Sequence, residues 1–198
     1  MKNIVLVFAT NNHHKANEIR QVLGDRFEIK TLKDAGIFID IPEPHATLEE
    51  NASEKSTFLK NLTGMDCFSE DTGLEVFSLN GEPGVKSARY AGDEANTSDN
   101  IKKLLTSLAG VDDRTAQFRT VISFVSGEKE YQFEGICKGH ITTGERGTEG
   151  FGYDPVFIPD GADKTFAEMS MAEKADFSHR NKATQKFISF LTKNEWPG

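Results

Sequence analysis

Apolar side chains fill positions 4 to 8 without interruption, a pattern typical of a strand that is covered on both faces. After Asn12, apolar residues recur at helical spacing at Ala16, Ile19 and Leu23, which predicts a helix. The chain is therefore expected to open with a buried strand, a tight turn and a helix.

The next apolar segments predict a strand at residues 28–31 and a helix over residues 47–62. Thr47 and Glu50 have the spacing of a capping box at the start of this helix, and Gly64 is suited to end it. A second strand and a second helix therefore follow the first pair.

In the second half of the chain, Ser98 is the expected N-cap of a helix. Its apolar stripe consists of Ile101, Leu104, Leu105 and Leu108. Apolar and polar side chains alternate in residues 116–126 and 129–137, which predicts an antiparallel hairpin. A short strand is expected at residues 156–158. A last helix should begin at Ser178. These elements predict a mixed α/β fold in one continuous domain.

The charge balance restricts the partners that such a domain can have. The 198 residues include 23 Lys and Arg against 31 Asp and Glu, giving a net charge of −8. An acidic chain is a poor match for nucleic-acid polymers and anionic membranes, so any phosphate site has to be local. Nine acidic residues against two lysines make residues 40–75 the most acidic stretch.

The cysteines and the N-terminus bear on the cellular compartment. Cys67 and Cys137 lie in apolar stretches without a CxxC pattern, which is typical of reduced core thiols. The apolar run at residues 4–8 is too short for a signal-peptide core or a membrane span. We therefore expect a cytoplasmic protein.

The junction between the first strand and the first helix is polar, and it consists of Thr10, Asn11, Asn12, His13, His14 and Lys15. Free N–H groups at a helix N-terminus favour a bound anion, and Lys15 adds a positive charge. Alternatively, an asparagine caps the helix and Lys15 is a solvated surface residue. Adjacent histidines diverge on a helix, which argues against a metal pair.

An acidic pair, Glu70 and Asp71, follows the short strand predicted at residues 67–69. Carboxylates at the end of a buried strand are costly unless a cation compensates them, so such pairs often mark metal sites. Oxygen ligands favour Mg²⁺ or Mn²⁺ over zinc. Alternatively, Asp71 caps the backbone in an Asp-x-Gly turn, and Lys55 is only a salt-bridge partner for a nearby carboxylate.

Two further segments carry candidate chemistry. In the run from Gly150 to Pro155, Phe151 or Tyr153 could stack on a planar ring and Asp154 could accept from ring N–H groups, although such a loop is also an ordinary tight turn. Lys174 and the Ser-His-Arg run at 178–180 suit an anion or a carbonyl oxygen, or simply cap the last helix.

Taken in order, these segments resemble the inosine triphosphate pyrophosphatase family. The matching runs are Ala-Thr-Asn-Asn at 9–12 with Lys15 and Glu18, Glu-Asn-Ala at 50–52 with Lys55, Asp-Thr-Gly-Leu-Glu-Val at 71–76, Gly-Glu-Pro-Gly-Val-Lys-Ser-Ala-Arg-Tyr-Ala-Gly at 81–92, Gly-Phe-Gly-Tyr-Asp-Pro at 150–155, and Lys174 with Ser-His-Arg at 178–180. The resemblance spans essentially the whole chain.

The resemblance implies a single domain over residues 1–198 with an elongated mixed β-sheet, flanking helices and two lobes around a central active-site cleft. It also implies a homodimer. The implied activity is hydrolysis of non-canonical purine nucleoside triphosphates (ITP, dITP and XTP) to the nucleoside monophosphate and pyrophosphate. The implied cofactor is Mg²⁺, with Mn²⁺ as the alternative.

The resemblance also implies a role for each matching residue. Asp71 would be the proton acceptor, and the metal ligands would be Glu43, Glu70 and Asp71. Substrate would be bound at the triphosphate end by Thr10, Asn11, Asn12, His13, His14, Lys15, Lys55 and Thr72. The nucleobase pocket would consist of Phe151, Gly152, Tyr153, Asp154, Lys174, Ser178, His179 and Arg180.

This chain departs from the family pattern at two positions, because Glu70 and Thr72 stand where the family usually has Asp and Ser. A nucleotide-binding module that senses without cleaving is therefore an alternative. The related septum-formation inhibitor family also hydrolyses nucleotides, but the Gly-Phe-Gly-Tyr-Asp-Pro and Ser-His-Arg runs argue against it. A nucleic-acid-binding protein would require a basic stripe that the composition disfavours.

Overall fold

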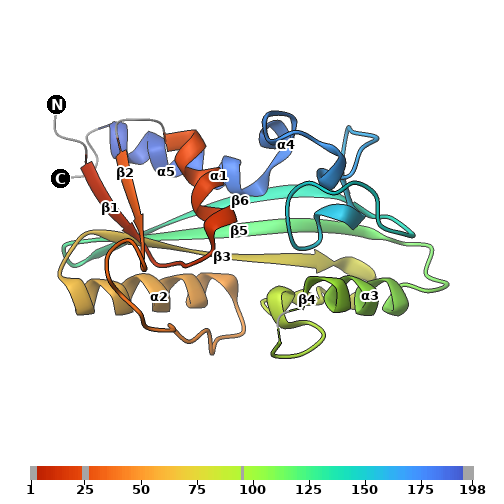
Figure 1. Ribbon diagram of the computed structural model, residues 1–198, viewed down its shortest axis with the longest axis horizontal. Helices are drawn as coiled ribbons and strands as arrows, with labels where there is room; N and C mark the ends of the chain where they lie inside the picture. The colour runs from red at the N-terminus through yellow and green to blue at the C-terminus, as the bar shows by residue number, and fades with distance from the viewer. Residues whose placement is uncertain (1–3, 24–26, 95, 194–198) are drawn as a thin grey trace. The chain divides into compact units, whose positions relative to one another are not determined.

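The computed structural model describes residues 4–23, 27–94 and 96–193 (Figure 1). The strands are β1 (Ile4–Phe8), β2 (Phe27–Thr31), β3 (Cys67–Val76), β4 (Pro83–Gly84), β5 (Thr115–Ser126), β6 (Lys129–Ile141) and β7 (Phe157–Pro159). The helices are α1 (His13–Leu23), α2 (Leu48–Thr63), α3 (Thr97–Ser107), α4 (Met171–Phe177) and α5 (His179–Thr192). Short 3₁₀ turns occupy Phe77–Leu79, Ser87–Arg89, Asp154–Val156 and Phe166–Glu168.

The strands form one mixed seven-stranded sheet in the order β2-β1-β3-β5-β6-β7, with β4 paired to β3. The first strand, β1, runs parallel to both β2 and β3, whereas β4 and β7 pair antiparallel to their neighbours. The predicted hairpin is present as β5 and β6, and β6 extends to Ile141, beyond the expected end. The mixed sheet with flanking helices confirms the expected fold class.

By its internal contacts the chain separates into two compact units, which are described one at a time. The first unit comprises the described parts of residues 1–71, 120–135 and 180–198, and the second comprises residues 72–119 and 136–179. The expectation of one domain with two lobes around a cleft stays a prediction.

The first unit has a core on each side of its strands. Leu6 and Phe8 of β1 pack with buried residues of α1 and α5, whereas the intervening Val7 packs on the other side with Leu59 of α2. Successive side chains of a strand point to opposite faces, so one continuous apolar run supplies both layers. Figure 1 shows α1 and α5 on one side of these strands and α2 on the other.

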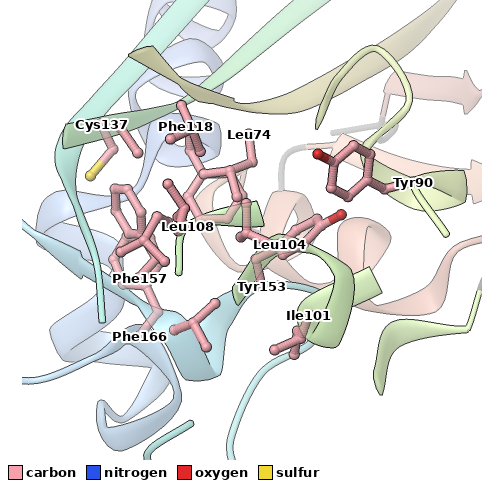
Figure 2. Packing of buried hydrophobic residues seen from close by; sticks show 14 of the residues in the cluster. Leu74, Tyr90, Ile101, Leu104, Leu108, Phe118, Cys137, Tyr153, Phe157 and Phe166 are labelled. Carbon is pink, nitrogen blue, oxygen red and sulfur yellow. The ribbon is translucent and has the colours of Figure 1, made fainter. Parts of the chain in front are cut away.

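The second unit is built around a single apolar cluster (Figure 2). Ile101, Leu104 and Leu108, which belong to the predicted stripe of α3, are fully buried in it. The rings of Phe118 and Phe157 meet edge to face with centroids 4.7 Å apart. This cluster supports the turn that carries the 150–155 run.

The predicted caps are confirmed for α2 but not for α3. The hydroxyl of Thr47 accepts from the backbone N–H of Glu50, and Gly64 takes the left-handed conformation at the other end of α2 with φ 66°. The predicted cap of α3 is wrong, because Asn96 accepts from the N–H of Asp99 and Ser98 lies within the first turn.

Strand β3 is longer than predicted, which changes the setting of the acidic pair. It continues through Asp71 to Val76 because its second half pairs with β4. Gly73 permits this pairing, since a Cβ there would lie 2.6 Å from the carbonyl oxygen of Gly84. The acidic pair therefore lies within the strand, and the prediction of a strand end or an Asp-x-Gly turn at Asp71 is wrong.

Helix α4 does not follow from the apolar pattern of the sequence. Ser170 and Glu173 form a complete capping box at its start, and this Ser-x-x-Glu spacing is a signal that was available in the sequence. Ser178, the expected N-cap of α5, lies between the two helices and donates its N–H to the carbonyl of Lys174.

The two cysteines are buried and are not joined in a disulfide. Burial raises the pKa of the Cys67 thiol to about 12, which keeps it protonated at neutral pH. Within the described ranges, no helix is both long and apolar enough to cross a membrane.

Candidate active site

Lys55 lies at the centre of a buried charge cluster in the first unit. Helix α2 presents its ammonium to Oε1 of Glu43, to the carbonyl oxygen of Glu70 at 2.9 Å and to Oδ1 of Asp71 at 3.3 Å. An ammonium has three donors, so these contacts account for all of them. Lys55 therefore holds two carboxylates from distant parts of the sequence beside each other.

Asn51, one turn before Lys55, fixes the loop that carries Glu43. Its side-chain oxygen accepts from the N–H of His45 at 2.9 Å, and its amide donates to the carbonyl of His45 at 3.2 Å. Residues four apart share one face of a helix. The same face of α2 therefore positions the loop and binds its carboxylate.

Burial and charge act in opposite directions on this cluster. Burial disfavours the charged ammonium of Lys55, but the charges of Asp71 and Glu43 outweigh this effect and raise its pKa. Burial raises the pKa of Asp71, and the lowering effect of Lys55 and Lys15 only partly offsets it. Asp71 is thus a carboxylate of raised basicity beside a permanently charged lysine.

The second oxygen of Asp71 has no hydrogen-bond partner. Its Oδ2 atom is buried and unsatisfied, whereas Oδ1 accepts from Lys55. A buried carboxylate oxygen without a partner is costly and is suited to receive a ligand. One oxygen of Asp71 is therefore held by Lys55, and the other is available to a ligand.

Glu70 has a different environment from Asp71. Successive side chains on β3 point to opposite faces, and Glu70 is turned toward α1 and α5. Its oxygens accept from Nε and NH2 of Arg180 at 2.7 and 2.8 Å, and Lys15 Nζ lies 3.3 Å from Oε1. This arrangement does not support the expected role of Glu70 as a metal ligand beside Asp71.

Arg180 is occupied by carboxylates. Besides the two contacts with Glu70, its NH1 donates to Glu18 of α1, and its side chain is almost completely buried. Burial alone would lower the pKa of Arg180, but Glu70 and Glu18 raise it above its ordinary value. The expectation that Arg180 contacts the nucleobase is not supported by these contacts.

Glu18 was part of the family pattern, and its position three residues after Lys15 places both on one face of α1.

The polar segment before α1 forms the cap that one of the alternatives predicted, but the other part of that alternative, a solvated Lys15, is wrong because Lys15 pairs with Glu70. Oδ1 of Asn12 accepts from the N–H groups of His14 and Lys15 at 3.0 and 3.2 Å, and Asn11 accepts from the N–H of Lys33 at 3.1 Å. The hydroxyl of Thr10 accepts from the N–H of Asn12. The side chains of His13, His14 and both asparagines are exposed. Binding of phosphate at this segment stays a prediction.

In the second unit, Asp154 and Lys174 form a buried ion pair. Oδ2 of Asp154 accepts from Nζ of Lys174 at 2.7 Å and from the N–H of Phe151 at 2.9 Å. The ammonium also lies 5.2 Å from the ring centre of Phe151 and 5.3 Å from that of Phe166. The 150–155 run and α4 thus meet at one charged pair.

The remaining residues of the expected base pocket are also in the second unit. Tyr153 is buried and donates to the carbonyl of Ser87 at 2.9 Å, so it does not offer an exposed ring for stacking. His179 stacks on Phe118 with centroids 4.7 Å apart and planes 11° apart. Ser178 is buried and Thr72 is half-buried. Phe151 remains the candidate for stacking on a base.

Gly150 leaves room for the carboxylate of Asp154. A Cβ on Gly150 would lie 2.1 Å from Oδ2 of Asp154, whereas a Cβ on Gly152 would meet nothing within 4 Å. Both glycines have a positive φ, 76° and 60°, so alanine is strained at either position.

We expect Gly150→Ala to lower stability by about 1 to 3 kcal/mol more than Gly152→Ala, because only the former displaces Asp154 from Lys174 and Phe151. Urea denaturation measures the difference, and Gly152→Ala is the matched control for the shared backbone strain. Equal stabilities of the two variants would show that the Asp154 contacts contribute little.

Comparisons with known proteins show which family this chain resembles over almost its whole length. The model of the Ham1 family matches residues 6–190. The dITP/XTP pyrophosphatase of Flavobacterium johnsoniae is 50% identical over 187 residues, which cover 94% of this chain and 97% of that protein. The protein of the same name from Porphyromonas gingivalis is 48% identical, with 94% and 96% covered.

Solved structures extend the likeness to the backbone. The Ham1 protein of Staphylococcus aureus has a TM-score of 0.87 and 38% identity, with 96% of this chain and 98% of that chain covered. A HAM1 protein from Coxiella burnetii has a TM-score of 0.88 and 33% identity, with 96% and 99% covered. Because the likeness in sequence and in backbone extends over almost the whole length, the chain belongs to the Ham1 family.

Proposed function

We propose that this protein hydrolyses non-canonical purine nucleoside triphosphates, namely dITP, ITP and XTP, to the monophosphate and pyrophosphate. The observation that carries the proposal is the buried carboxylate of Asp71, which Lys55 holds beside Glu43 and whose Oδ2 has no partner. The relatives named dITP/XTP pyrophosphatase support the choice of substrate.

The carboxylates of this cluster fit a Mg²⁺ ion. Mg²⁺ prefers oxygen ligands and is commonly held by one or two carboxylates together with substrate phosphates. Asp71 offers the unpartnered Oδ2 and Glu43 a half-buried carboxylate, so these two residues would hold it. No group of three potential metal-ligating side chains occurs in the described part of the chain, so we propose that substrate phosphates would supply the remaining ligands. When bound, the ion neutralises phosphate charge and polarises the P–O bonds; Mn²⁺ is the alternative ion.

The side chains of the first unit can perform the displacement. Asp71 accepts a proton from the water that attacks the α-phosphorus, and the bond from this phosphorus to the pyrophosphate breaks. Lys55 keeps the carboxylate of Asp71 oriented, and Lys15 stabilises negative charge on the departing pyrophosphate. Asn12 caps the first turn of α1, and the positive end of the helix dipole there would favour the negative charge of the phosphates.

Selection of the base is assigned to Lys174 in the second unit. Hypoxanthine and xanthine carry an acceptor at O6, whereas adenine carries a donor there. Lys174 has only donors, and Asp154 fixes its ammonium at 2.7 Å. A mispaired donor against the amino group of adenine disfavours dATP strongly, because buried unpaired polar groups are costly. Phe151 would stack on the purine, and His179 would contribute a further polar contact.

The resemblance also leads us to propose a cytoplasmic homodimer whose substrate is a small nucleotide. The net charge of −8 supports this choice, since long polyanions are repelled whereas one triphosphate can be held by a few local cations.

The direct test is a substrate panel on the purified protein. We expect pyrophosphate release from dITP, ITP and XTP, little release from dATP, and loss of activity when EDTA removes Mg²⁺. Inosine monophosphate must appear together with pyrophosphate. Formation of the diphosphate and inorganic phosphate would contradict the proposed bond cleavage, and tight binding of dITP without turnover would favour a sensing module.

A further inference from the structure

Glu70 is the most enclosed carboxylate of the first unit that the proposed mechanism does not use. Its side chain has no exposed area, and it lies where β3, α1 and α5 meet. Arg180 reaches both of its oxygens with two parallel N–H···O contacts, the strongest geometry for such a pair. A third cation, Lys15, approaches Oε1 at 3.3 Å.

These contacts argue against a metal on Glu70. A divalent cation there would have to displace a bidentate arginine in a buried place and would be repelled by Arg180 and Lys15 at short range. Asp71 is different, since its Oδ2 is unpartnered and its side chain points to the opposite face of β3. Two neighbouring carboxylates therefore have separate tasks.

The contacts also show what Glu70 holds. Arg180 is fixed by Glu70 and by Glu18, so the carboxylate of Glu70 is itself fixed. Lys15 is about one-fifth exposed, unlike the fully buried Glu70, and its ammonium has three donors, of which a single contact with Glu70 uses one. A long lysine side chain loses considerable rotamer entropy when it binds a ligand, and a fixed counter-charge reduces that loss.

We propose that Glu70 is a positioning residue that, clamped by Arg180, holds the ammonium of Lys15 in place for the substrate triphosphate, and that it is not a metal ligand. This inference rests on the proposed function, because it assigns Lys15 to the phosphates. Glu70 acts through Lys15, so its contribution disappears when Lys15 is absent.

The test is a double-mutant cycle with Glu70→Gln and Lys15→Met in the full-length protein. Each single variant should raise the KM for dITP about tenfold with a smaller change in kcat, and the double variant should resemble Lys15→Met alone. If Glu70→Gln raised the KM for dITP by the same factor in the wild-type protein and in Lys15→Met, the proposal would be overturned.

A Mg²⁺ titration of the same variants separates positioning from metal binding. Glu70→Gln should keep the wild-type half-saturating Mg²⁺ concentration, whereas Glu43→Gln, the matched control, should raise it. A raised Mg²⁺ requirement in Glu70→Gln would show that Glu70 is a metal ligand. If Glu70→Gln folds poorly, Glu70→Asp serves in its place. It keeps the charge on a shorter side chain, so its affinity for dITP should lie between those of Lys15→Met and the wild type.

Binding of inorganic tripolyphosphate without Mg²⁺, followed by calorimetry, tests the inference independently of turnover. Wild-type protein should bind it, and Lys15→Met and Glu70→Gln should weaken binding to a similar extent. If the two variants weaken tripolyphosphate binding but the wild-type protein hydrolyses no nucleotide of the panel, the proposed activity is contradicted. The proposed role of Glu70 would still stand. Binding that is unchanged in both variants would overturn that role.

Discussion

Asp71→Asn is expected to reduce the rate of pyrophosphate release from dITP by about 10³-fold, within the range typical of losing a general base. The amide is nearly the same size as the carboxylate and keeps an oxygen for Lys55, but it cannot accept a proton from the attacking water. Because burial already disfavours the charge of Asp71, the neutral side chain should leave the melting temperature close to that of the wild type. Steady-state assays and calorimetric unfolding measure the two effects.

Asp112→Asn is the matched control, since Asp112 is exposed and the same change there should alter neither rate nor stability. Calorimetry with dITP should still detect binding to Asp71→Asn, which separates loss of chemistry from loss of the site. A variant that retains a tenth or more of the wild-type rate would remove Asp71 from the role of base.

Lys55→Met is expected to reduce both stability and turnover. The methionine fills a similar volume but leaves Asp71 and Glu43 without their shared cation in a buried place. Removing one partner of a buried ion pair costs about 3 to 5 kcal/mol, which for a chain of this size lowers Tm by about 10 °C. Turnover measured well below that Tm should also fall by at least about 10²-fold, because Asp71 loses the contact that orients it.

Lys60→Met provides the comparison on the same helix. Lys60 pairs with Asp66, and both side chains are partly exposed. Lys60→Met should therefore lower the free energy of unfolding by at most about 1 kcal/mol. Urea titrations of both variants give the two free energies of unfolding. If Lys55→Met proved as stable as Lys60→Met, the cluster would not depend on Lys55.

Local elements of the fold followed closely from the sequence because their signals are short in range. The apolar run at residues 4–8 forms β1, of which residues 6–8 are buried, and the stripe Ala16, Ile19 and Leu23 is the buried face of α1. Thr47 and Gly64 end α2 as predicted, since capping depends on residues within one turn.

The extension of β3 and the presence of α4 could not be predicted from short-range signals. The sequence around Asp71 reads as a turn, but pairing with β4 extends the strand, and this depends on a segment that lies ten residues further along. Helix α4 has a capping box, but its seven residues are too few for a convincing apolar periodicity. Pairing energy and packing decide such cases, and both depend on distant residues.

The sequence by itself determined the motifs, the acidic character of residues 40–75 and the chemical types present at the candidate site. Only the tertiary structure decided how the neighbours Glu70 and Asp71 are used. The pleat of β3 sends one carboxylate to Arg180 and Lys15 and the other to Lys55. The physical reason is that the chemical behaviour of a buried carboxylate depends on the cations that compensate its charge. Folding brings these cations from segments up to 110 residues away.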